Sequence, residues 1–439
     1  MSNTTINAVA RSKALIALVL SGIALGGVVA WQVRRTVAPA PRATTPITHE
    51  AYIWQRSWDK ATKGAVAGRT ARFERVVVLA AELTIRRDEV AVGKAQVDYH
   101  LLKQTGRPIG VALRIGPYSG PFGADSRVFA RIVEVSRDIL DRARTAGLDL
   151  AEFQIDFDCP DSKLPGYAAW VSQLKRQLPG QKITITALPS WLAKPGCEQL
   201  LAAADGYILQ VHSLQRPTSA DSIGPLCDTA AARAAVERAA RLGRPFRVAL
   251  PTYSYLVAFN QNGKFAGLSA EGPRPSWPDS YRVVLHQADS TAIAALVREW
   301  TISRPAAMQG IIWYRLPTED DTMNWSWAAL QGVMAGRPPK ADLAVVVEKP
   351  QSKLAEIVLT NKGTDDAILD RDVLVRLDAS FVLAADSVGG FTLHKDERLL
   401  RLTPAAKGQR LRPGQRRLIA WIRLSEDKEV NAHVERQGS

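Results

Sequence analysis

The stretch from Ala151 to Pro160 carries carboxyl groups at a spacing that suits acid–base chemistry. Side chains of a strand alternate between its two faces, so one face presents Glu152, Gln154, Asp156 and Asp158, and the other presents Phe153, Ile155 and Phe157. Asp156 and Asp158 lie about 7 Å apart by strand rise, close enough for one pKa of the pair to be raised. Asp158 is the candidate acid, base or substrate-orienting carboxylate, with Asp156 as its electrostatic partner. The alternative is that both cap the next helix or pair with arginines.

Glycoside hydrolysis is the reaction that most directly uses two carboxyl groups, one protonated and one ionised. Glu82 ends the predicted second strand and is a further candidate carboxylate; the alternative is a helix N-cap or a surface residue. The acidic cluster Glu319–Asp321 follows the eighth strand and is most simply a solvated loop.

Polar and aromatic residues near the ends of other strands are candidate substrate-binding groups. Arg114 and Tyr118 follow the third strand and would meet a polar or anionic sugar group, although Arg114 also suits an ion pair with Asp156. Gln210 and His212 share one face at the end of the sixth strand. Aromatic rings offer apolar faces to a sugar and polar tips for hydrogen bonds. The candidates of this kind are Tyr253, Tyr255, Trp313 and Tyr314, and the alternative is that they are ordinary core residues of the barrel.

No metal site or cofactor is expected. Six histidines and three cysteines are scattered without metal-ligand spacing, and no glycine-rich phosphate loop follows the first strand. In an oxidising compartment two of the cysteines could pair, and Cys197 with Cys227 and Cys159 with Cys197 are both plausible.

These residues are positioned by a repeating pattern of a β-rich run followed by a helical stretch. Eight rounds over residues 51–335 predict a (β/α)8 TIM barrel, with a doubly wound open sheet as the less supported alternative. The β-rich runs are Ala51–Gln55, Arg75–Glu82, Ile109–Ile115, Ala151–Asp158, Lys182–Leu188, Gly206–His212, Phe246–Thr252 and Gln309–Leu316. The clearest helical patterns are Ser126–Thr145, Gly166–Leu178, Asp228–Leu242 and Ser290–Ser303. The candidate residues then gather at the C-terminal end of the barrel.

Two further regions depart from this repeat. After the seventh strand, Leu256–Leu268 predicts a hairpin around Asn262-Gly263, which would form a wall over the barrel mouth. Residues 341–435 contain short strand-like runs without helices, which predicts an all-β, sandwich-like domain used for support or attachment.

The N-terminal region predicts export. Arg11 and Lys13 precede an uncharged run from Ala14 to Ala30, whose length is at the lower limit for a bilayer span and also suits a signal peptide. Residues 1–35 are therefore either a signal or an N-terminal hydrophobic helix that anchors the chain in the inner membrane through residues 14–31. Residues 36–50 form a proline- and threonine-containing linker. The expected location is periplasmic or extracellular, with or without the anchor in the cytoplasmic membrane.

The charge of the chain limits its partners. The 439 residues carry a formal net charge of +14 and are 46% hydrophobic, which indicates a folded chain that favours anionic partners. There is no dense basic run with interleaved aromatics, so nucleic acid is the less favoured partner and a polysaccharide or oligosaccharide the favoured one.

The barrel resembles glycoside hydrolase family 18, the chitinases and chitinase-like lectins, and more closely an uncharacterised bacterial domain-of-unknown-function family. In the chitinase group the fourth strand ends in Asp-x-x-Asp-x-Asp-x-Glu, where the Glu is the general acid and the preceding Asp orients the acetamido group of the substrate. Asp156 and Asp158 match the second and third aspartates, and Pro160 stands at the position of the Glu. Trp313 resembles that group's platform Trp, and the insertion is similar in placement to the domain that deepens the chitinase cleft.

Three functions follow from this reading. The leading hypothesis is a glycoside-hydrolase-like barrel that acts on an envelope or extracellular glycan, using Asp158 and a second carboxylate. The competing hypothesis is a non-catalytic, lectin-like glycan-binding protein, since proline cannot donate a proton. The third is an envelope scaffold, for which the barrel needs no site.

Overall fold

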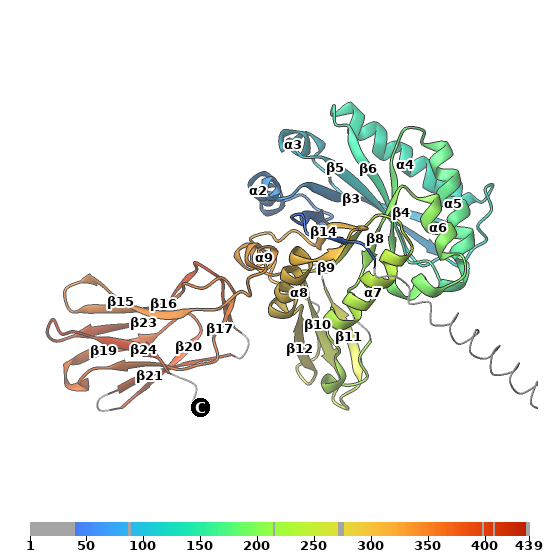
Figure 1. Ribbon diagram of the computed structural model, residues 1–439. Coiled ribbons are helices and arrows are strands. Elements are labelled where there is room, and N and C mark those ends of the chain that lie inside the picture. Colours follow the sequence, from blue (N-terminus) through green and yellow to red (C-terminus); the bar gives the residue numbers. More distant parts are fainter. Residues whose placement is uncertain are drawn as a thin grey trace, which may run out of the picture. The chain divides into compact units, whose positions relative to one another are not determined.

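The computed structural model describes residues 40–86, 89–213, 216–270, 276–396, 399–406 and 409–435. The chain divides into two units, Met1–Pro41 and Arg42–Ser439, and the helices and strands described below lie in the second (Figure 1). The predicted signal or anchor, residues 1–35, lies outside the described residues. Within the described part, no helix is both long and apolar enough to span a bilayer.

Eight parallel strands close into a barrel, as the sequence predicts. The first strand, β2, pairs with both the second, β3, and the last, β14, so the sheet has no open end. The barrel strands are β2 (Thr48–Ile53), β3 (Arg75–Arg86), β5 (Ile109–Ile115), β6 (Leu150–Phe157), β7 (Ile183–Ala187), β8 (Gly206–Gln210), β9 (Phe246–Pro251) and β14 (Met308–Tyr314). The open-sheet alternative is therefore wrong.

Helices connect the strands and cover the outside of the barrel (Figure 1). They are α2 (Lys60–Arg69), α3 (Tyr99–Gln104), α4 (Arg127–Thr145), α5 (Leu164–Gln177), α6 (Cys197–Ala203), α7 (Thr229–Arg241), α8 (Ser290–Ile302) and α9 (Trp327–Met334). Short 3-10 turns are η1 (Thr70–Arg72), η2 (Asp161–Lys163), η3 (Pro189–Ala193) and η4 (Ala220–Ser222). Ser126, Asp228 and Asp289 cap α4, α7 and α8 by accepting backbone N–H groups, which explains why these helices begin where the sequence pattern predicts.

Alternation along each strand separates a lumen face from a helix-covered face. The core of the lumen contains Tyr52, Trp54, Val77, Leu79, Ala112, Ile208, Ala249 and Ile312, with Tyr314 packed against it. The barrel is thus filled by side chains, and polar groups remain at its two ends.

The N-terminal end of the lumen contains a buried ion network of Glu50, Arg75, Glu152 and Arg247, which we call the bottom network. Arg247 Nη1 and Nη2 donate to the two carboxylate oxygens of Glu152 at 2.9 and 2.7 Å, and Arg247 also pairs with Glu50. Arg75 lies 3.6 Å from Glu152 and 3.8 Å from Glu50. Burial raises the pKa of Glu50. In Glu152 burial also acts to raise the pKa, but the attraction and hydrogen bonds of Arg247 together with the attraction of Arg75 and Lys182 outweigh it and lower the pKa.

Gly110 on β5 leaves the space that the bottom network occupies. A Cβ atom at this position would lie 2.8 Å from Glu152 Cγ and 3.1 Å from Val77 Cγ2. We expect Gly110→Ala to lower the free energy of unfolding by about 1–3 kcal/mol, because the packed neighbours have to move. Urea denaturation measures this change.

Gly64→Ala is the matched control, because Gly64 lies inside α2 and a Cβ atom added there would have no neighbour within 4 Å. It is expected to raise stability by up to about 1 kcal/mol through helix propensity. Equal stability of the two variants would contradict the close packing around Gly110.

The predicted hairpin after the seventh strand is present and belongs to a larger sheet. Strands β10 (Ser254–Phe259) and β11 (Phe265–Ser269) form the hairpin, and β12 (Arg282–Gln287) adds a third antiparallel strand beside β10. A second hairpin was not predicted: β3 continues past the barrel to Arg86, where it pairs with β4 (Glu89–Lys94). A short pair, β1 (Arg42–Ala43) with β13 (Arg304–Pro305), includes residues of the predicted linker.

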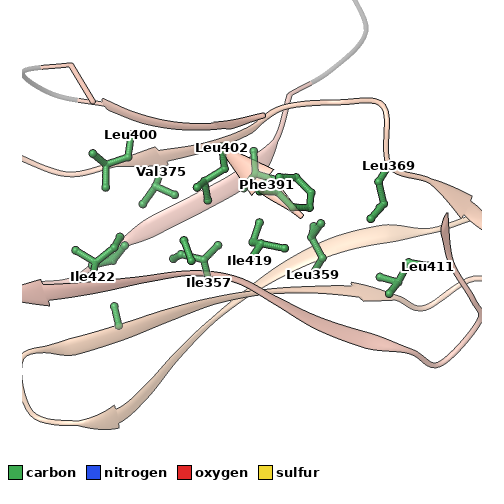
Figure 2. Packing of buried hydrophobic residues seen from close by; sticks show 14 of the residues in the cluster. Ile357, Leu359, Leu369, Val375, Phe391, Leu400, Leu402, Leu411, Ile419 and Ile422 are labelled. Atoms are coloured by element: carbon green, nitrogen blue, oxygen red, sulfur yellow. The ribbon is translucent and has the colours of Figure 1, made fainter. Parts of the chain in front are cut away.

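The C-terminal region is all β, as predicted. One sheet has the order β15 (Leu343–Gln351), β16 (Leu354–Asn361), β23 (Arg416–Leu424) and β19 (Val382–Ser387). The other has the order β20 (Phe391–Lys395), β21 (Leu399–Pro404), β18 (Val373–Arg376) and β24 (Asn431–Val434), and β17 (Ala367–Ile368) pairs with β22 (Arg410–Leu411). Figure 2 shows the apolar side chains packed in the core, among them Ile357, Leu402 and Ile419.

All three cysteines are free and buried. Cys159 follows β6, Cys197 begins α6, and Cys227 precedes the N-cap of α7. Neither of the two plausible disulfides is formed.

Candidate functional site

The polar face of β6 becomes more exposed towards the C-terminal end of the barrel, which we call the mouth. Glu152 and Gln154 are fully buried in the lumen. The Asp156 side chain is 16% exposed, and that of Asp158, which directly follows the strand, is 52% exposed. The opposite face packs outward, where Phe157 contacts Tyr167 of α5 at a ring separation of 4.9 Å. The strand therefore presents one shielded and one accessible carboxyl group at the mouth.

Four polar side chains from neighbouring strands form a row across the mouth, which we call the mouth layer. Glu82 of β3 stands beside Arg114 of β5, and Arg114 stands beside Asp156 of β6. Thr186 of β7 completes the row by donating its hydroxyl to Asp156 Oδ1 at 2.7 Å. The parallel strand register thus places the cationic Arg114 between the carboxylates of Glu82 and Asp156.

Arg114 links the two aspartates. Its Nη1 lies 3.8 Å from Asp156 Oδ2, and its Nη2 donates to Asp158 Oδ2 at 3.2 Å. Burial raises the pKa of Asp156, and the attraction of Arg114 and the Thr186 hydrogen bond only partly oppose this rise. Burial alone would lower the pKa of Arg114, but the two aspartates outweigh it and raise the pKa. The arginine is thus fixed as a cation between the two carboxyl groups.

Glu82 is engaged by a second arginine. Arg56 donates to both carboxylate oxygens of Glu82, at 2.6 and 2.9 Å. Because β3 continues to Arg86, Glu82 lies within a strand and the helix N-cap alternative is wrong. Each carboxylate of the mouth layer therefore faces an arginine.

An aromatic wall lies beside the mouth layer. Tyr52, Trp54 and Tyr314 contact one another edge to face, with ring separations of 5.3–5.8 Å. Gln154 donates to the Tyr52 hydroxyl at 2.6 Å, and burial raises the pKa of that phenol. Tyr314 is partly exposed, so it is the ring of this wall that a ligand can reach.

His212 and Tyr253 extend the wall. His212 Nδ1 and the Tyr253 hydroxyl are 3.1 Å apart, and both rings contact Tyr314 at 5.5–5.6 Å. Tyr255 packs against Tyr253 at 5.2 Å, and Gln210 donates to the backbone carbonyl of His212 at 3.3 Å. These four predicted residues are thus brought together.

Burial keeps His212 uncharged by lowering its pKa from 6.5 to about 3. The unfolded chain binds this proton below pH 6.5, whereas the folded chain does not until about pH 3. Stability contributed by the neutral ring is therefore lost as pH falls through this window, by up to about 1.4 kcal/mol per pH unit.

We expect His212→Gln to make acid destabilisation shallower between pH 6 and pH 4, because glutamine does not titrate. Urea unfolding at several pH values measures the slope. His394→Gln, on the exposed surface of β20, is the control and should leave the slope unchanged. Identical slopes for wild type and His212→Gln would contradict the buried, neutral state of His212.

Two predicted site residues do not join the mouth. Trp313 is fully buried on the outer face of β14, where its Nε1 donates to His49 Nδ1 at 3.2 Å. Burial holds His49 uncharged by lowering its pKa to about 4. The platform expected from Trp313 is instead available from its neighbour Tyr314, which faces the lumen.

Tyr118 also lies outside the mouth, in an aromatic cluster beneath α4 and α5. Its ring stacks on Trp170 at 5.5 Å, and its hydroxyl donates to the carbonyl of Pro121 at 2.9 Å. With the residue only 8% exposed, the side chain serves packing and is not open to a ligand.

The acidic loop after β14 is partly ordered by an ion pair. Arg315 Nη2 and Asp321 Oδ2 are 2.5 Å apart, and their side chains are only 8% and 11% exposed; Glu319 and Asp320 are exposed. The solvated-loop reading thus holds for Glu319 and Asp320 and not for Asp321. Among the residues that the structure describes, no group of three histidine, cysteine or carboxylate side chains is placed to hold a metal ion.

Thr186, Arg56, Tyr52 and Trp54 contribute to the mouth but were not among the predicted site residues. Thr186 was detectable, since it is a polar residue at a lumen-facing position of the fifth strand, level with Asp156. Arg56 follows the first strand, and nothing in its local sequence distinguishes it from the other scattered arginines.

The fold and site define a closed (β/α)8 barrel whose mouth contains a carboxylate–arginine row beside an aromatic wall. Residues 105–319 match the family described as Domain of unknown function (DUF3142). This match confirms the predicted resemblance to an uncharacterised domain-of-unknown-function family. Residues 344–425 match a second family, Domain of unknown function (DUF8456).

Solved structures similar to the chain include chitinase-type barrels. The spore cortex-lytic enzyme SleL of Bacillus cereus is 12% identical, with 67% of this chain and 75% of that chain covered and a TM-score of 0.47. A family GH18 chitinase from Chromobacterium violaceum is 12% identical, with 89% and 91% covered and a TM-score of 0.41. Chitinase ChiA74 from Bacillus thuringiensis is 9% identical, with 89% and 100% covered and a TM-score of 0.40. No curated protein matches the sequence.

Proposed function

We propose that the barrel is a glycoside hydrolase whose active site is the mouth around Asp156 and Asp158. The observation that carries this proposal is the contrast between the two carboxyl groups of one strand face. Burial favours the uncharged form of Asp156 by raising its pKa, whereas Asp158 is more than half exposed beside an aromatic wall. Paired carboxyl groups in unlike environments are the usual arrangement for acid and base roles in glycan cleavage.

Burial raises the pKa of Asp156 but also shields it from a substrate, with 16% of its side chain exposed against 52% for Asp158. Asp158 is the group of the pair that can touch a substrate, and for this reason we assign the acid role to it. In the reaction, the Asp158 carboxyl gives its proton to the glycosidic oxygen while the bond from that oxygen to the anomeric carbon breaks. Water then supplies the new oxygen at the anomeric carbon and returns a proton to the carboxylate. Asp156, about 7 Å away along the strand, is its electrostatic partner and is held in place by Arg114 and Thr186.

The observed end of β6 changes how the chitinase signature fits this chain. The signature places its glutamate where the fourth strand ends, and β6 ends at Phe157. Pro160 is exposed and begins η2, whereas Asp158 is the last residue of the polar face. We infer that Asp158 occupies the acid position, so the proline at 160 does not remove the acid.

Tyr314 and Arg114 supply the binding contacts in this proposal. The partly exposed ring of Tyr314 offers an apolar face to the C–H groups of a sugar. Arg114 contributes N–H donors to sugar hydroxyls, and its charge keeps the site attractive to ring oxygens and acidic substituents. His212 and Tyr253 pack against the ring of Tyr314 and help to fix its orientation.

Glycan binding without hydrolysis is the second candidate function. The observation that favours it is that Arg114 contacts both Asp156 and Asp158. In this arrangement Arg114 donates to one oxygen of Asp158 and so occupies the group that would have to reach the glycosidic oxygen. A bound glycan has to displace Arg114 from Asp158 for the acid role to operate.

A binding and turnover screen tests these alternatives. Residues 42–439, which span the second compact unit, are incubated with envelope-type and chitin-type oligosaccharides, and products are followed by mass spectrometry. Cleavage that is weakened in Tyr314→Ala supports hydrolysis at the mouth. Binding without products, lost in Tyr314→Ala, supports the lectin-like function; no binding and no products would refute both and favour a scaffold.

We also propose that the barrel works outside the cytoplasm. The support is the uncharged run from Ala14 to Ala30 behind Arg11 and Lys13. An alkaline phosphatase fusion at the C-terminus would be active if the chain is exported and inactive if it is not.

A further inference from the structure

The sheet β15-β16-β23-β19 has one face in the core of the C-terminal domain and one face directed outward. Ile357, Ile419 and Ile422 are buried in the core (Figure 2). Trp421 lies between the core residues Ala420 and Ile422 on β23, so strand alternation directs its side chain outward. Unlike most tryptophans of the described chain, Trp421 is partly exposed.

The strand register places a carboxylate on each side of Trp421. Glu356 of β16 is its cross-strand partner on one side, and Asp386 of β19 is its partner on the other. Directly opposed side chains have Cβ atoms about 4.5–5.5 Å apart, so all three side chains share one small area. Asp386 is exposed and Glu356 is partly exposed.

Apolar side chains continue this area along the sheet. Val346, Val358 and Leu418 stand in register as the row next to Trp421; Leu418 is 37% exposed and Val346 is partly exposed, whereas Val358 between them is buried. Within the described residues, Trp421 has neither a ring contact nor a hydrogen bond, and Glu356 has no ion pair. Asp386 uses one oxygen to accept the N–H of Ser387 at 2.8 Å, which leaves its other oxygen for a ligand.

This combination of groups matches the surface of an uncharged sugar. An indole ring covers the C–H groups of a pyranose while its N–H stays available as a donor. Carboxylates accept hydrogen bonds from hydroxyl groups, and two of them beside the ring repel anionic polymers. Arg423, two residues from Trp421 on the same outward face of β23, adds one cation, so this area is less positive than expected from the net charge of +14 of the whole chain.

We propose that the outer face of this sheet, centred on Trp421 with Glu356 and Asp386, binds an uncharged polysaccharide. This surface is separate from the barrel mouth, and the proposal does not require the barrel to hydrolyse anything. If the barrel does act on a glycan, the second site raises the local concentration of polymer without affecting short oligosaccharides.

Retention of the protein on insoluble chitin and on insoluble cellulose tests the proposal. Binding to soluble polygalacturonate is the anionic comparison. Trp421→Ala in residues 42–439 is expected to lower retention at least about tenfold, which corresponds to about 1.4 kcal/mol, whereas Trp421→Tyr retains part of it. Glu356→Lys is expected to weaken retention on the neutral polymers and does not disturb the core. Unchanged retention in both Trp421→Ala and Glu356→Lys would overturn the proposal.

Two measurements separate this proposal from its alternatives. Tyr314→Ala should leave retention on insoluble polymer intact, so a failure of the barrel proposal and a failure of this one give different results. Light scattering shows whether Trp421→Ala changes the oligomeric state; a dimer that becomes a monomer, together with unchanged retention, would assign the face to a second copy of the chain instead. Thermal unfolding confirms that each variant is folded.

Discussion

Asp158→Asn is expected to lower kcat for glycan cleavage by about 10²- to 10⁴-fold, the usual contribution of a positioned general acid. Asparagine keeps the size of the side chain and can still accept from Arg114, but it cannot give a proton to the leaving oxygen. Binding of the oligosaccharide should therefore change much less than turnover. The measurement is steady-state cleavage of an oligosaccharide that the wild-type protein hydrolyses.

Asp161→Asn is the matched control for Asp158→Asn. Asp161 is three residues further along the chain and pairs with Lys194 at 3.4 Å, outside the mouth layer, so its loss should leave turnover within about twofold. Full turnover in Asp158→Asn would contradict the acid role and favour Asp156 or Glu82 as the essential carboxylate.

Pro160→Glu tests which position of β6 holds the acid. In the Asp158→Asn background, a glutamate at 160 should not restore cleavage, because the backbone at 160 has already turned into η2. Asp158→Glu, by contrast, should keep measurable turnover, since it retains a carboxyl group at the end of the polar face. If Pro160→Glu restored cleavage in the Asp158→Asn background, residue 160 and not residue 158 would be the position of the acid.

Arg247→Met is expected to lower the free energy of unfolding by about 3–5 kcal/mol, the cost of leaving buried charges without their partner. Arg247 is the only group of the bottom network that contacts Glu152 bidentately and Glu50 as well. The side chains of Glu50 and Glu152 are 5% and 0% exposed, so water cannot replace the lost cation. Urea or guanidinium unfolding monitored by tryptophan fluorescence measures the change.

Arg233→Met provides the comparison for Arg247→Met. Arg233 and Glu299 form a 2.7 Å pair with both side chains substantially exposed, and its loss should cost less than about 1 kcal/mol. Adding Glu152→Leu to Arg247→Met should recover part of the stability, because it removes one unpaired buried carboxylate. A cost for Arg247→Met as small as that of Arg233→Met would mean that the network does not hold the barrel bottom.

The barrel was predictable because each strand and helix carries a local signal. Strands such as Phe246–Pro251 are short apolar runs, and helices such as α7 begin at a capping aspartate. The third strand of the insertion, β12, was missed because Arg282–Gln287 contains no turn signal that ties it to β10. The hairpin of β3 and β4 was missed because the sequence pattern suggested that β3 ends at Glu82.

The site residues of a single strand could be predicted from the sequence, but the contacts between residues of different strands could not. Alternation along β6 identified Asp156 and Asp158, and the parallel register then placed Arg114 between them. The same alternation assigns Trp313 and Tyr314 to opposite faces of β14. Resemblance to the chitinase strand favoured Trp313. Ile312 faces the lumen and Ile311 faces outward, so alternation directs Trp313 outward and Tyr314 into the lumen.

Residue pairs far apart in the sequence were beyond sequence reasoning. Arg247 is a single cation within an apolar strand, and the local sequence does not predict that it contacts Glu50 and Glu152. Likewise, Trp421 acquires Glu356 and Asp386 as neighbours only through the register of three strands. Both constellations depend on how distant strands pair, which no local pattern encodes.

The three free cysteines allow local unfolding of the native chain to be measured by thiol alkylation. Burial raises the pKa of Cys159 and of Cys227 to about 12 and that of Cys197 to about 11, so none presents a reactive thiolate while the fold is intact. Alkylation at each one then requires local or global unfolding, and its rate measures how often that segment opens. Cys159 reports on the end of β6, Cys197 on the start of α6 and Cys227 on the entry to α7, so mass-resolved labelling follows three parts of the barrel at once without any engineered label.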